Sequence, residues 1–315
     1  MSKAGKTPLK ATDADFVGRF REVISDPLNL LIERVSEAGI LDGNEVCLHN
    51  GNRVPAAGAG AYYGQFSTLL VLNRGVHEPL EEYVFQELVK HLPASPRMIE
   101  LGAYWAHYSM WLKRVRPHAT VIMVEPDLGN LAAGQANFAR NGFEGEFIHA
   151  AVGKGLWELD DFFATRGLSH LDILHVDIQG AEGALLDGGR QTLGNSRIDY
   201  LCVSTHSQDL HRGVAEELTR FGYRVEVSSD FDNETTSYDG FIFAASHTTQ
   251  RVFSNFNHFG RTTIATSSPD DVLRAVINMR DSTSLSESPA LKGEERVGPS
   301  EREGPVEIFY KIGEI

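Results

Sequence analysis

The chain has 315 residues, of which 42% are hydrophobic and 23% charged, and its net charge at neutral pH is −14. This composition is typical of a globular protein, and the negative charge argues against a nucleic acid as partner, because binding phosphates requires a cationic surface. Neither a membrane-length apolar stretch nor an apolar signal region is apparent, so we expect a cytoplasmic protein with no membrane partner. Its two cysteines, Cys47 and Cys202, are expected to be buried free thiols.

Residues 1–74 are predicted to form an extension of helices and strands. Asp13 can begin one helix, and the pair Asp26-Pro27 can begin a second that ends at Gly39. Two runs with a strand-like pattern follow, at Glu45–Arg53 and Ser67–Asn73.

The segment "PAAGAGAYYGQF" lies between these two runs and combines glycine and alanine with Tyr62, Tyr63 and Phe66. It is either a connecting loop or a lid over a site. As a lid, it would help to select the substrate.

Residues 75–247 are predicted to form an α/β domain. A helix in "GVHEPLEEYVFQELVKHLP" ends at Pro93, and short β-type runs then alternate with helical runs. The predicted strands are Met98–Leu101, Val121–Val124, Glu146–Ala150, Leu171–Val176, Ile198–Ser204, Arg224–Ser228 and Gly240–Ala244. The predicted helices are Tyr104–Val115, Leu128–Arg140, Leu159–Arg166, Gly180–Leu186 and Ser207–Phe221. This alternation predicts a mostly parallel sheet, and the last two strands, which lack a helix between them, should form an antiparallel edge hairpin.

Residues 248–315 are predicted to form a C-terminal extension that is partly disordered. The stretch "SSPDDVLRAVINM" is typical of a short capped helix. The segment after it is rich in proline, glycine, serine and charge, which disfavours a packed structure.

Acidic residues stand where several predicted strands end. In an open parallel sheet, ligands bind beyond the carboxyl ends of the strands. Glu100 and Gly102 end the first strand, Glu125 ends the second and Asp177 ends the fourth. An acidic residue at the position of Glu125 can accept both ribose hydroxyls of a nucleoside, although it can equally be a helix cap.

Two cofactor classes fit this pattern, and the loop after the first strand favours one of them. A dinucleotide requires G-x-G-x-x-G, but only Gly102 is present, with Tyr104 and His107 at the other positions. S-adenosylmethionine has no phosphate and carries a positive sulfonium, which suits nearby carboxylates. We therefore favour the methyl donor over NAD.

The chain resembles a known family through "GVHEPLEEYVFQELV", "MIELGAYWAHYSMWL", "VEPD", "HAAVG", "LDDFF" and above all "HVDIQGAEGALLDG". In this order, from Gly75 to Ala245, these motifs are similar to those of the FkbM family of S-adenosylmethionine-dependent methyltransferases. The resemblance implies the seven-stranded, Rossmann-like sheet of class I methyltransferases. It also implies methyl transfer to a hydroxyl of a small molecule, usually a natural product or sugar.

The resemblance also implies roles for individual residues. Glu100 and Gly102 match the glycine-loop motif, Glu125 the ribose ligand and Ala151 the position near the adenine edge, while His206 matches a frequent family histidine. The residues expected to bind the cofactor are Glu100, Gly102, Tyr104, Glu125, Pro126, Ala151, Asp177 and Gln179. The signature after the fourth strand comprises Asp177, Gln179, Gly180 and Glu182.

Two departures from the family pattern concern the site. The first motif usually reads Asp-x-Gly-Ala-Asn-x-Gly, whereas here Glu100 replaces the aspartate and Tyr104-Trp105-Ala106 replace the last three positions. The Ser-Thr before His206 replaces a more usual acidic residue. The altered loop is the reason to keep a second function open, namely a catalytically inactive binding or regulatory module.

We expect His206 and Asp177 to be the catalytic residues. Histidine titrates near neutrality, so His206 can remove the acceptor proton while Asp177 orients the acceptor or the donor amine, although a structural histidine is the alternative. Glu182 is either a site residue or a carboxylate stabilised by the helix dipole. A metal-assisted version with Asp160, Asp161, Asp177, Glu182 and His206 as ligands is a less favoured alternative, and we assign no metal.

Overall fold

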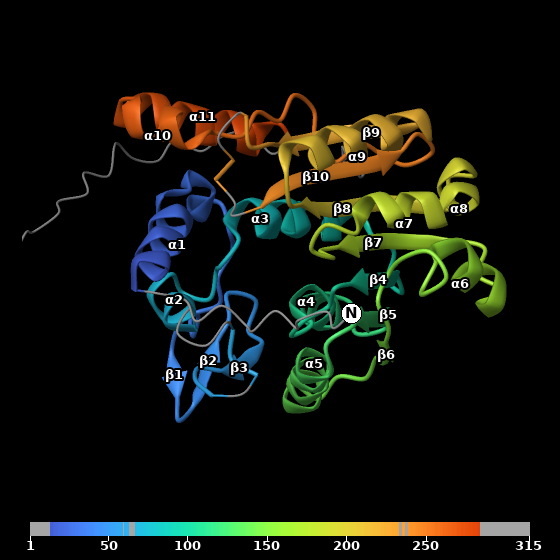
Figure 1. The fold of residues 1–315 in the computed structure, drawn as a ribbon. Coiled ribbons are helices and arrows are strands. Elements are labelled where there is room, and N and C mark those ends of the chain that lie inside the picture. Colours follow the sequence, from blue (N-terminus) through green and yellow to red (C-terminus); the bar gives the residue numbers. More distant parts are fainter. Residues whose placement is uncertain (1–12, 59, 63–66, 233–234, 237–238, 284–315) are drawn as a thin grey trace, which may run out of the picture. The chain divides into compact units, whose positions relative to one another are not determined.

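Seven strands form one sheet in the order β6-β5-β4-β7-β8-β10-β9 (Figure 1). The computed structural model describes residues 13–58, 60–62, 67–232, 235–236 and 239–283. The strands from β6 to β8 are parallel, and β10 pairs antiparallel with both β8 and β9. Their bounds are β4 Arg97–Leu101, β5 Thr120–Glu125, β6 Glu146–His149, β7 Leu171–Val176, β8 Ile198–Thr205, β9 Tyr223–Ser229 and β10 Gly240–Ser246. The predicted class I methyltransferase sheet with an antiparallel edge hairpin is therefore confirmed.

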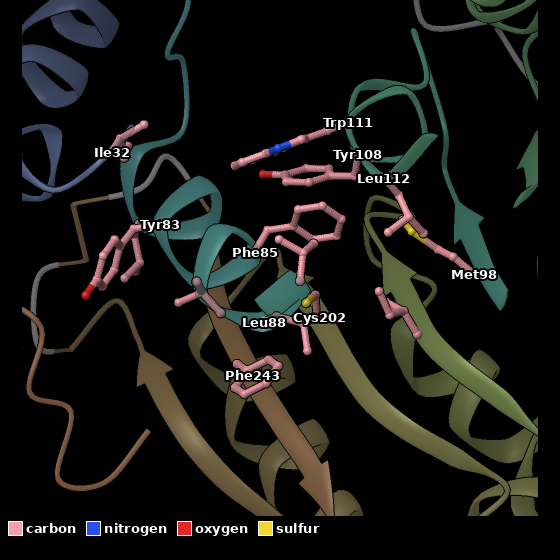
Figure 2. Packing of buried hydrophobic residues seen from close by; sticks show 14 of the residues in the cluster. Ile32, Tyr83, Phe85, Leu88, Met98, Tyr108, Trp111, Leu112, Cys202 and Phe243 are labelled. Atoms are coloured by element: carbon pink, nitrogen blue, oxygen red, sulfur yellow. The ribbon is translucent and has the colours of Figure 1, made fainter. Parts of the chain in front are cut away.

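Successive side chains along the strands point into two hydrophobic cores, one on each face of the sheet. Met98 belongs to one core with α3 and α4, whereas its neighbour Ile99 belongs to the other with α6, α7 and α9. Figure 2 shows Phe85 beside Tyr108 and Trp111 in the first core; its ring centroid lies 5.1 Å from each of theirs. The helices of this region are α3 Pro79–Leu88, α4 His107–Val115, α5 Leu128–Arg140, α6 Leu159–Arg166, α7 Glu182–Gly188, α8 Arg190–Gly194 and α9 Gln208–Arg220, with the short 3-10 helix η3 at Val89–His91.

The strand order places a crevice site at the centre of the sheet. From β4 the chain proceeds outward to β5 and β6, and then returns to β7 on the other side of β4. Such a reversal of strand order leaves a crevice beyond the carboxyl ends of the two central strands. Because β10 is antiparallel to β8, its first residue, Gly240, pairs with Thr205 at the end of β8. The start of β10 therefore lies at the same edge.

The N-terminal region corrects two of the predictions. The helix expected to end at Gly39 is only the 3-10 turn η1 Pro27–Leu30, because the Arg34 side chain donates to the carbonyls of Asn29 and Ile32, at 2.7 and 3.0 Å. The strand expected at Ser67–Asn73 is the helix α2 Ser67–Leu72; a short apolar run fits either structure. The remaining elements are α1 Asp13–Ser25, β1 Leu41–Asp42, β2 Glu45–Cys47 and β3 Arg53–Pro55.

The C-terminal part that is described packs against the first core. Helix α11, Pro269–Asp281, begins after Ser268, whose hydroxyl accepts from Asp271 N at 3.2 Å, so the predicted capped helix is confirmed. Val276 and Met279 of this helix are buried, while α10 Arg261–Thr266 has no buried residue. Cys47 and Cys202 are buried free thiols, as expected. Among the described residues, no helix combines the length and hydropathy needed to cross a membrane.

Candidate active site

Gly102 ends β4 at the closest approach between two strand ends. Its φ of +74° lies in the left-handed region, and a Cβ there would lie 1.7 Å from the carbonyl oxygen of Asp177. The amide of Gly102 donates to Val124 O and that of Asp177 to Leu101 O, both at 2.9 Å. Only glycine permits this geometry, which joins the end of β4 to the ends of β5 and β7.

The loop after Gly102 keeps an unusual backbone despite its altered sequence. Tyr104 has φ 44° and Ala106 has φ 63°, so two non-glycine residues are left-handed. These are the positions at which the FkbM pattern has asparagine and glycine, the residues that adopt this conformation most easily. The loop therefore adopts left-handed backbone at the cost of strain, and α4 begins at His107 rather than at the predicted Tyr104.

Glu100 points beneath the loop to the start of α4. Its Oε2 accepts from Ser109 N at 3.0 Å, and the residue is 3% exposed. Burial raises the pKa of Glu100 to about 7, against the hydrogen bonds from Ser109. These contacts make Glu100 an anchor for the helix N-terminus.

Glu125 ends β5 and holds the loop from the other side. Its Oε2 accepts from Tyr104 N at 2.9 Å, and its Oε1 accepts from Asp127 N at 2.9 Å and from Asn130 Nδ2 at 3.4 Å. A carboxylate has about four acceptor sites, so these three donors leave room for a further hydroxyl. Glu125 thus has the position expected of a ribose ligand and acceptor capacity for one of the two ribose hydroxyls.

Two further predicted cofactor residues line the neighbouring strand ends. Pro126 and Ala151 are exposed, directly after β5 and shortly after β6. The carbonyl of Pro126 lies 3.0 Å from Nε2 of His149, and that of Ala151 accepts from Trp157 N at 3.1 Å. Both residues lie at the carboxyl edge of the sheet.

The signature after β7 forms a tight turn before α7. Gln179 has φ 54° and Gly180 has φ 100°, which explains why α7 begins at Glu182 and not at the predicted Gly180. Gln179 Nε2 donates to Asp177 Oδ1 at 2.8 Å, and Gly180 N donates to Glu182 Oε1 at 3.3 Å. The turn thereby presents Asp177 at the surface and leaves Glu182 only 1% exposed.

His206 lies at the centre of three carboxylates. Its Nδ1 lies 2.9 Å from Glu182 Oε1, and its Nε2 lies 3.2 Å from Asp177 Oδ1 and 3.6 Å from Asp239 Oδ1. Asp177 follows the end of β7, His206 follows the end of β8 and Asp239 precedes the start of β10. The structure therefore brings together the two predicted catalytic residues, and adds Asp239 to them.

The carboxylates control protonation in this cluster. Burial lowers the pKa of His206, but the contacts with Asp177 and Glu182 and the charge of Asp239 outweigh it and raise the pKa to about 10. Burial raises the pKa of Asp239 to about 7, against the effect of His206. At neutral pH, His206 is therefore a cation, and Asp239 titrates in the range that suits a general base.

Sequence reasoning missed Asp239 and Glu81. Glu81 of α3 accepts from Ser204 Oγ at 3.0 Å; burial and the charges of Glu78 and Asp177 raise the pKa of its carboxyl well above the usual range. Asp239 was recognisable, because the residue before a strand that runs antiparallel to the rest of the sheet lies at the edge where the parallel strands end. Glu81 gave no comparable signal in an acid-rich helix.

The structure brings together only part of the ligand set of the metal-assisted alternative. Asp177, Glu182 and His206 are in contact, with Asp239 beside them. Asp160 instead accepts from the amides of Gln191 and Thr192, at 2.9 and 2.7 Å, and so caps α8. Asp161 is exposed in the first turn of α6.

The lid prediction concerns residues close to the glycine loop. Tyr62 is 2% exposed, and its ring centroid lies 5.2 Å from that of Trp105. The Tyr104 hydroxyl donates to Ala61 O at 3.4 Å, which links the segment before Tyr62 to the loop. The other two residues of the prediction, Tyr63 and Phe66, lie outside the described residues.

A family model described as the methyltransferase FkbM domain matches residues 60–225, which is more than half of the chain. The chain belongs to the FkbM methyltransferase family. The resemblance inferred from the sequence motifs is thus confirmed. This FkbM-family chain is also 38% identical over 55 residues to the 2-O-methyltransferase NoeI of Sinorhizobium fredii, a match that covers 18% of the chain and 22% of the relative.

Solved structures similar to this FkbM-family chain are distant. The precorrin-6y C5,15-methyltransferase of Geobacter metallireducens is 19% identical with a TM-score of 0.39, and the match covers 52% of this chain and 87% of that one. TrmK of M. capricolum in complex with S-adenosylhomocysteine is 11% identical with a TM-score of 0.39, over 63% and 96% of the two chains.

Proposed function

We propose that the protein is an S-adenosylmethionine-dependent O-methyltransferase that acts on a hydroxyl of a small molecule. The observation that carries the proposal is the position of the His206 cluster. The cluster includes Asp177 and lies at the edge of the sheet that also holds Glu125. Gly102 of the glycine loop is next to Asp177, because a Cβ on Gly102 would overlap the carbonyl oxygen of Asp177. A site for proton removal and a cradle for a nucleoside thus share the crevice of a methyltransferase fold.

The residues of this edge fit S-adenosylmethionine better than a phosphate-bearing cofactor. Glu125 is placed to hold the ribose hydroxyls, with Gly102 and Tyr104 beneath and Pro126 and Ala151 alongside. Asp177 and Asp239 make the crevice acidic, which favours a cation and repels a pyrophosphate. When bound, S-adenosylmethionine supplies an electrophilic methyl group and leaves as S-adenosylhomocysteine.

The acceptor hydroxyl needs a group that removes its proton. A histidine whose pKa is about 10 already carries a proton at neutral pH, so we assign the base role to Asp239, whose pKa is about 7. His206 then positions the carboxylates of Asp177 and Asp239 through its Nε2, while its Nδ1 faces Glu182. This changes the role expected for His206 from base to a cation that positions the base.

The choice of oxygen as the methylated atom is supported by the name of one relative. The curated relative from Sinorhizobium fredii is a 2-O-methyltransferase, although the match spans less than a quarter of its length. A general base with a pKa near 7 is also what an alcohol acceptor requires, because a hydroxyl is a weak nucleophile until deprotonated.

A turnover assay tests the proposal. The full chain is incubated with S-adenosylmethionine and a panel of sugars, phenols and hydroxy acids, and S-adenosylhomocysteine is quantified by mass spectrometry. We expect Asp239→Asn to lower turnover by about 10²-fold or more with little change in donor affinity. Asp232→Asn is the matched control, since Asp232 pairs with Arg212 on the surface at 2.8 Å. Equal loss of turnover and donor affinity in Asp239→Asn would refute the base role.

The inactive binding or regulatory module remains the second candidate function. The observation that favours it is the strained loop, in which Tyr104 and Ala106 replace residues that accept left-handed backbone. It predicts donor binding without turnover on any member of the acceptor panel.

A further inference from the structure

Three histidines surround one fully buried glutamate beneath the glycine loop. Glu82 of α3 is 0% exposed, and His49, His77 and His107 are each 2% exposed or less. They come from three parts of the chain: the loop after β2, the segment before α3 and the first residue of α4. None of these histidines takes part in the candidate active site.

The cluster leaves several buried polar atoms without hydrogen bonds. Within the described part of the chain, both ring nitrogens of His49 and of His107, and Oε2 of Glu82, have no hydrogen-bond partner. Almost all buried polar groups are satisfied in native proteins. One unsatisfied atom from each of His49, Glu82 and His107 lies close to the others, which indicates a missing common partner.

The spacing of these atoms fits a metal ion. His49 Nε2 lies 3.7 Å from Glu82 Oε2, and His107 Nε2 lies 3.4 Å from Glu82 Oε1. In a tetrahedral site with bonds of about 2.0–2.1 Å, neighbouring ligand atoms are roughly 3.4 Å apart. One ligand atom from each of His49, Glu82 and His107 lies within 4.8 Å of the others.

We propose that His49, Glu82 and His107 bind a divalent transition-metal ion, for which zinc is the best fit. Two imidazoles and one carboxylate are a zinc donor set, and imidazole disfavours magnesium and calcium. The metal content of the chain tests this site directly, so the test does not depend on the proposed methyl transfer.

His77 orients the carboxylate from outside the coordination sphere. Its Nδ1 lies 2.6 Å from Glu82 Oε1, too close for both atoms to be ligands of one tetrahedral ion, and its backbone N donates to the same oxygen at 3.2 Å. The other ring nitrogen, Nε2, lies 3.5 Å from Glu78 Oε2. A histidine that holds a ligand carboxylate in this way typically changes metal affinity by 10–100-fold.

One side of the cluster lies near the surface. His49, although only 1% exposed, lines a surface pocket together with Gln86, Trp111 and the cations Arg34, Lys90 and Arg116. Glu82 supplies one negative charge to the site, while Glu78 beside His77 is also paired with Arg19 at 3.4 Å.

The alternative to a metal is a proton shared within the cluster. The charge of Glu78 and the contacts with Glu82 raise the pKa of His77 against its burial, whereas burial lowers the pKa of His49 to about 4 and also lowers that of His107. One proton on His77 would neutralise Glu82 but leave the nitrogens of His49 and His107 unpaired. A metal would instead take up one nitrogen of each of these two rings together with an oxygen of Glu82.

The consequence for the molecule lies in the strained loop. His107 follows Ala106 directly, so an ion bound to His107 would fix the end of the loop that carries the two left-handed residues. It would also tie the N-terminal segment around His49 to α3. The three side chains leave the fourth position of a tetrahedral ion to a water molecule.

The test is metal analysis of the purified full chain after reconstitution with zinc and removal of excess ion. We expect about one zinc per chain in the wild type and at most a tenth of that in His49→Ala and His107→Ala, with His77→Ala weakened 10–100-fold in a chelator competition. The exposed His118→Ala and the cluster variant His206→Ala should retain the ion. Zinc should raise the Tm of the chelator-treated wild type but not that of the His49 variant.

Circular dichroism verifies that the variants are folded, and a cobalt-substituted wild type provides a measurement without mutation. We expect the visible spectrum of tetrahedral Co²⁺ with nitrogen and oxygen ligands. The proposal is overturned if the wild type holds less than a tenth of an ion and zinc leaves its Tm unchanged. It is equally overturned if His206→Ala, and not His49→Ala, loses the ion.

Discussion

Replacement of Gly102 by alanine tests the close approach on which the crevice depends. The added Cβ would lie 1.7 Å from the carbonyl oxygen of Asp177 and 2.7 Å from its carbonyl carbon. Regaining van der Waals contact requires a shift of roughly 2 Å between the ends of β4 and β7. Such a shift must break the hydrogen bond from Asp177 N to Leu101 O, which is 2.9 Å long.

The cost can be estimated from three contributions. The left-handed φ of +74° costs alanine about 1–2 kcal/mol, a lost backbone hydrogen bond about 1 kcal/mol, and residual overlap about 1–2 kcal/mol more. We therefore expect the free energy of unfolding to fall by about 3–5 kcal/mol.

Equilibrium urea unfolding followed by tryptophan fluorescence measures this change, with two glycines as matched controls. Gly180 has φ +100° with nothing within 4 Å of its missing Cβ, so Gly180→Ala should cost only the strain, about 1–2 kcal/mol. Gly183 lies in α7 with open space and no positive φ, so Gly183→Ala should stabilise the protein by up to about 1 kcal/mol. A Gly102→Ala variant no less stable than Gly180→Ala would refute the close approach.

Three further predictions concern protonation and capping. The pKa of His206 rises from 6.5 to about 10 on folding, so its contribution to stability is complete below pH 6.5 and is lost as the pH rises through 10. The difference in stability between the wild type and His206→Gln should therefore shrink over this range. A pH-independent difference would contradict a cationic His206. Burial raises the pKa of Asp26 from 3.8 to about 6, so the wild type loses stability as the pH rises from 3.8 to 6. Asp26→Asn should gain about 1–3 kcal/mol in stability over the wild type between pH 4 and 7, because asparagine can still cap Leu28 N and bond Thr236. Thermal melts of both proteins at pH 4 and 7 measure this gain, and an unchanged difference would show that Asp26 is not desolvated. Asp160→Ala should lower the free energy of unfolding by about 1 kcal/mol and leave donor affinity unchanged, since Asp160 caps a helix; loss of donor binding in a folded variant would place it in the site.

The sequence predicted the sheet well because its signals are local. Each strand from Met98 to Ala245 is a short apolar run bounded by polar or glycine residues, and the helices between the strands have their own periodicity. The N-terminal errors have a different cause. The turn at Pro27 ends early because the Arg34 side chain donates to the carbonyls of Asn29 and Ile32, and the pattern of apolar residues and caps does not record such a side-chain contact.

The candidate site was predictable where it follows strand ends and unpredictable where it depends on long-range packing. Asp177, Glu125 and His206 follow from the rule that parallel strands end at one edge. Glu81 does not, because the entire α3 helix is buried, glutamates included. The histidine cluster is even less accessible to sequence reasoning, since His49 and His107 are far apart in the chain and show no metal-binding spacing.

The central claim is that the carboxyl edge of the sheet binds S-adenosylmethionine through Glu125. Calorimetric titration of S-adenosylmethionine and S-adenosylhomocysteine into the wild type, Glu125→Ala and the exposed control Glu144→Ala tests it most directly. We predict micromolar binding of both ligands to the wild type and to Glu144→Ala, and its loss in Glu125→Ala, with each variant verified as folded. Wild-type affinity in Glu125→Ala, or no binding to the wild type, would contradict the account.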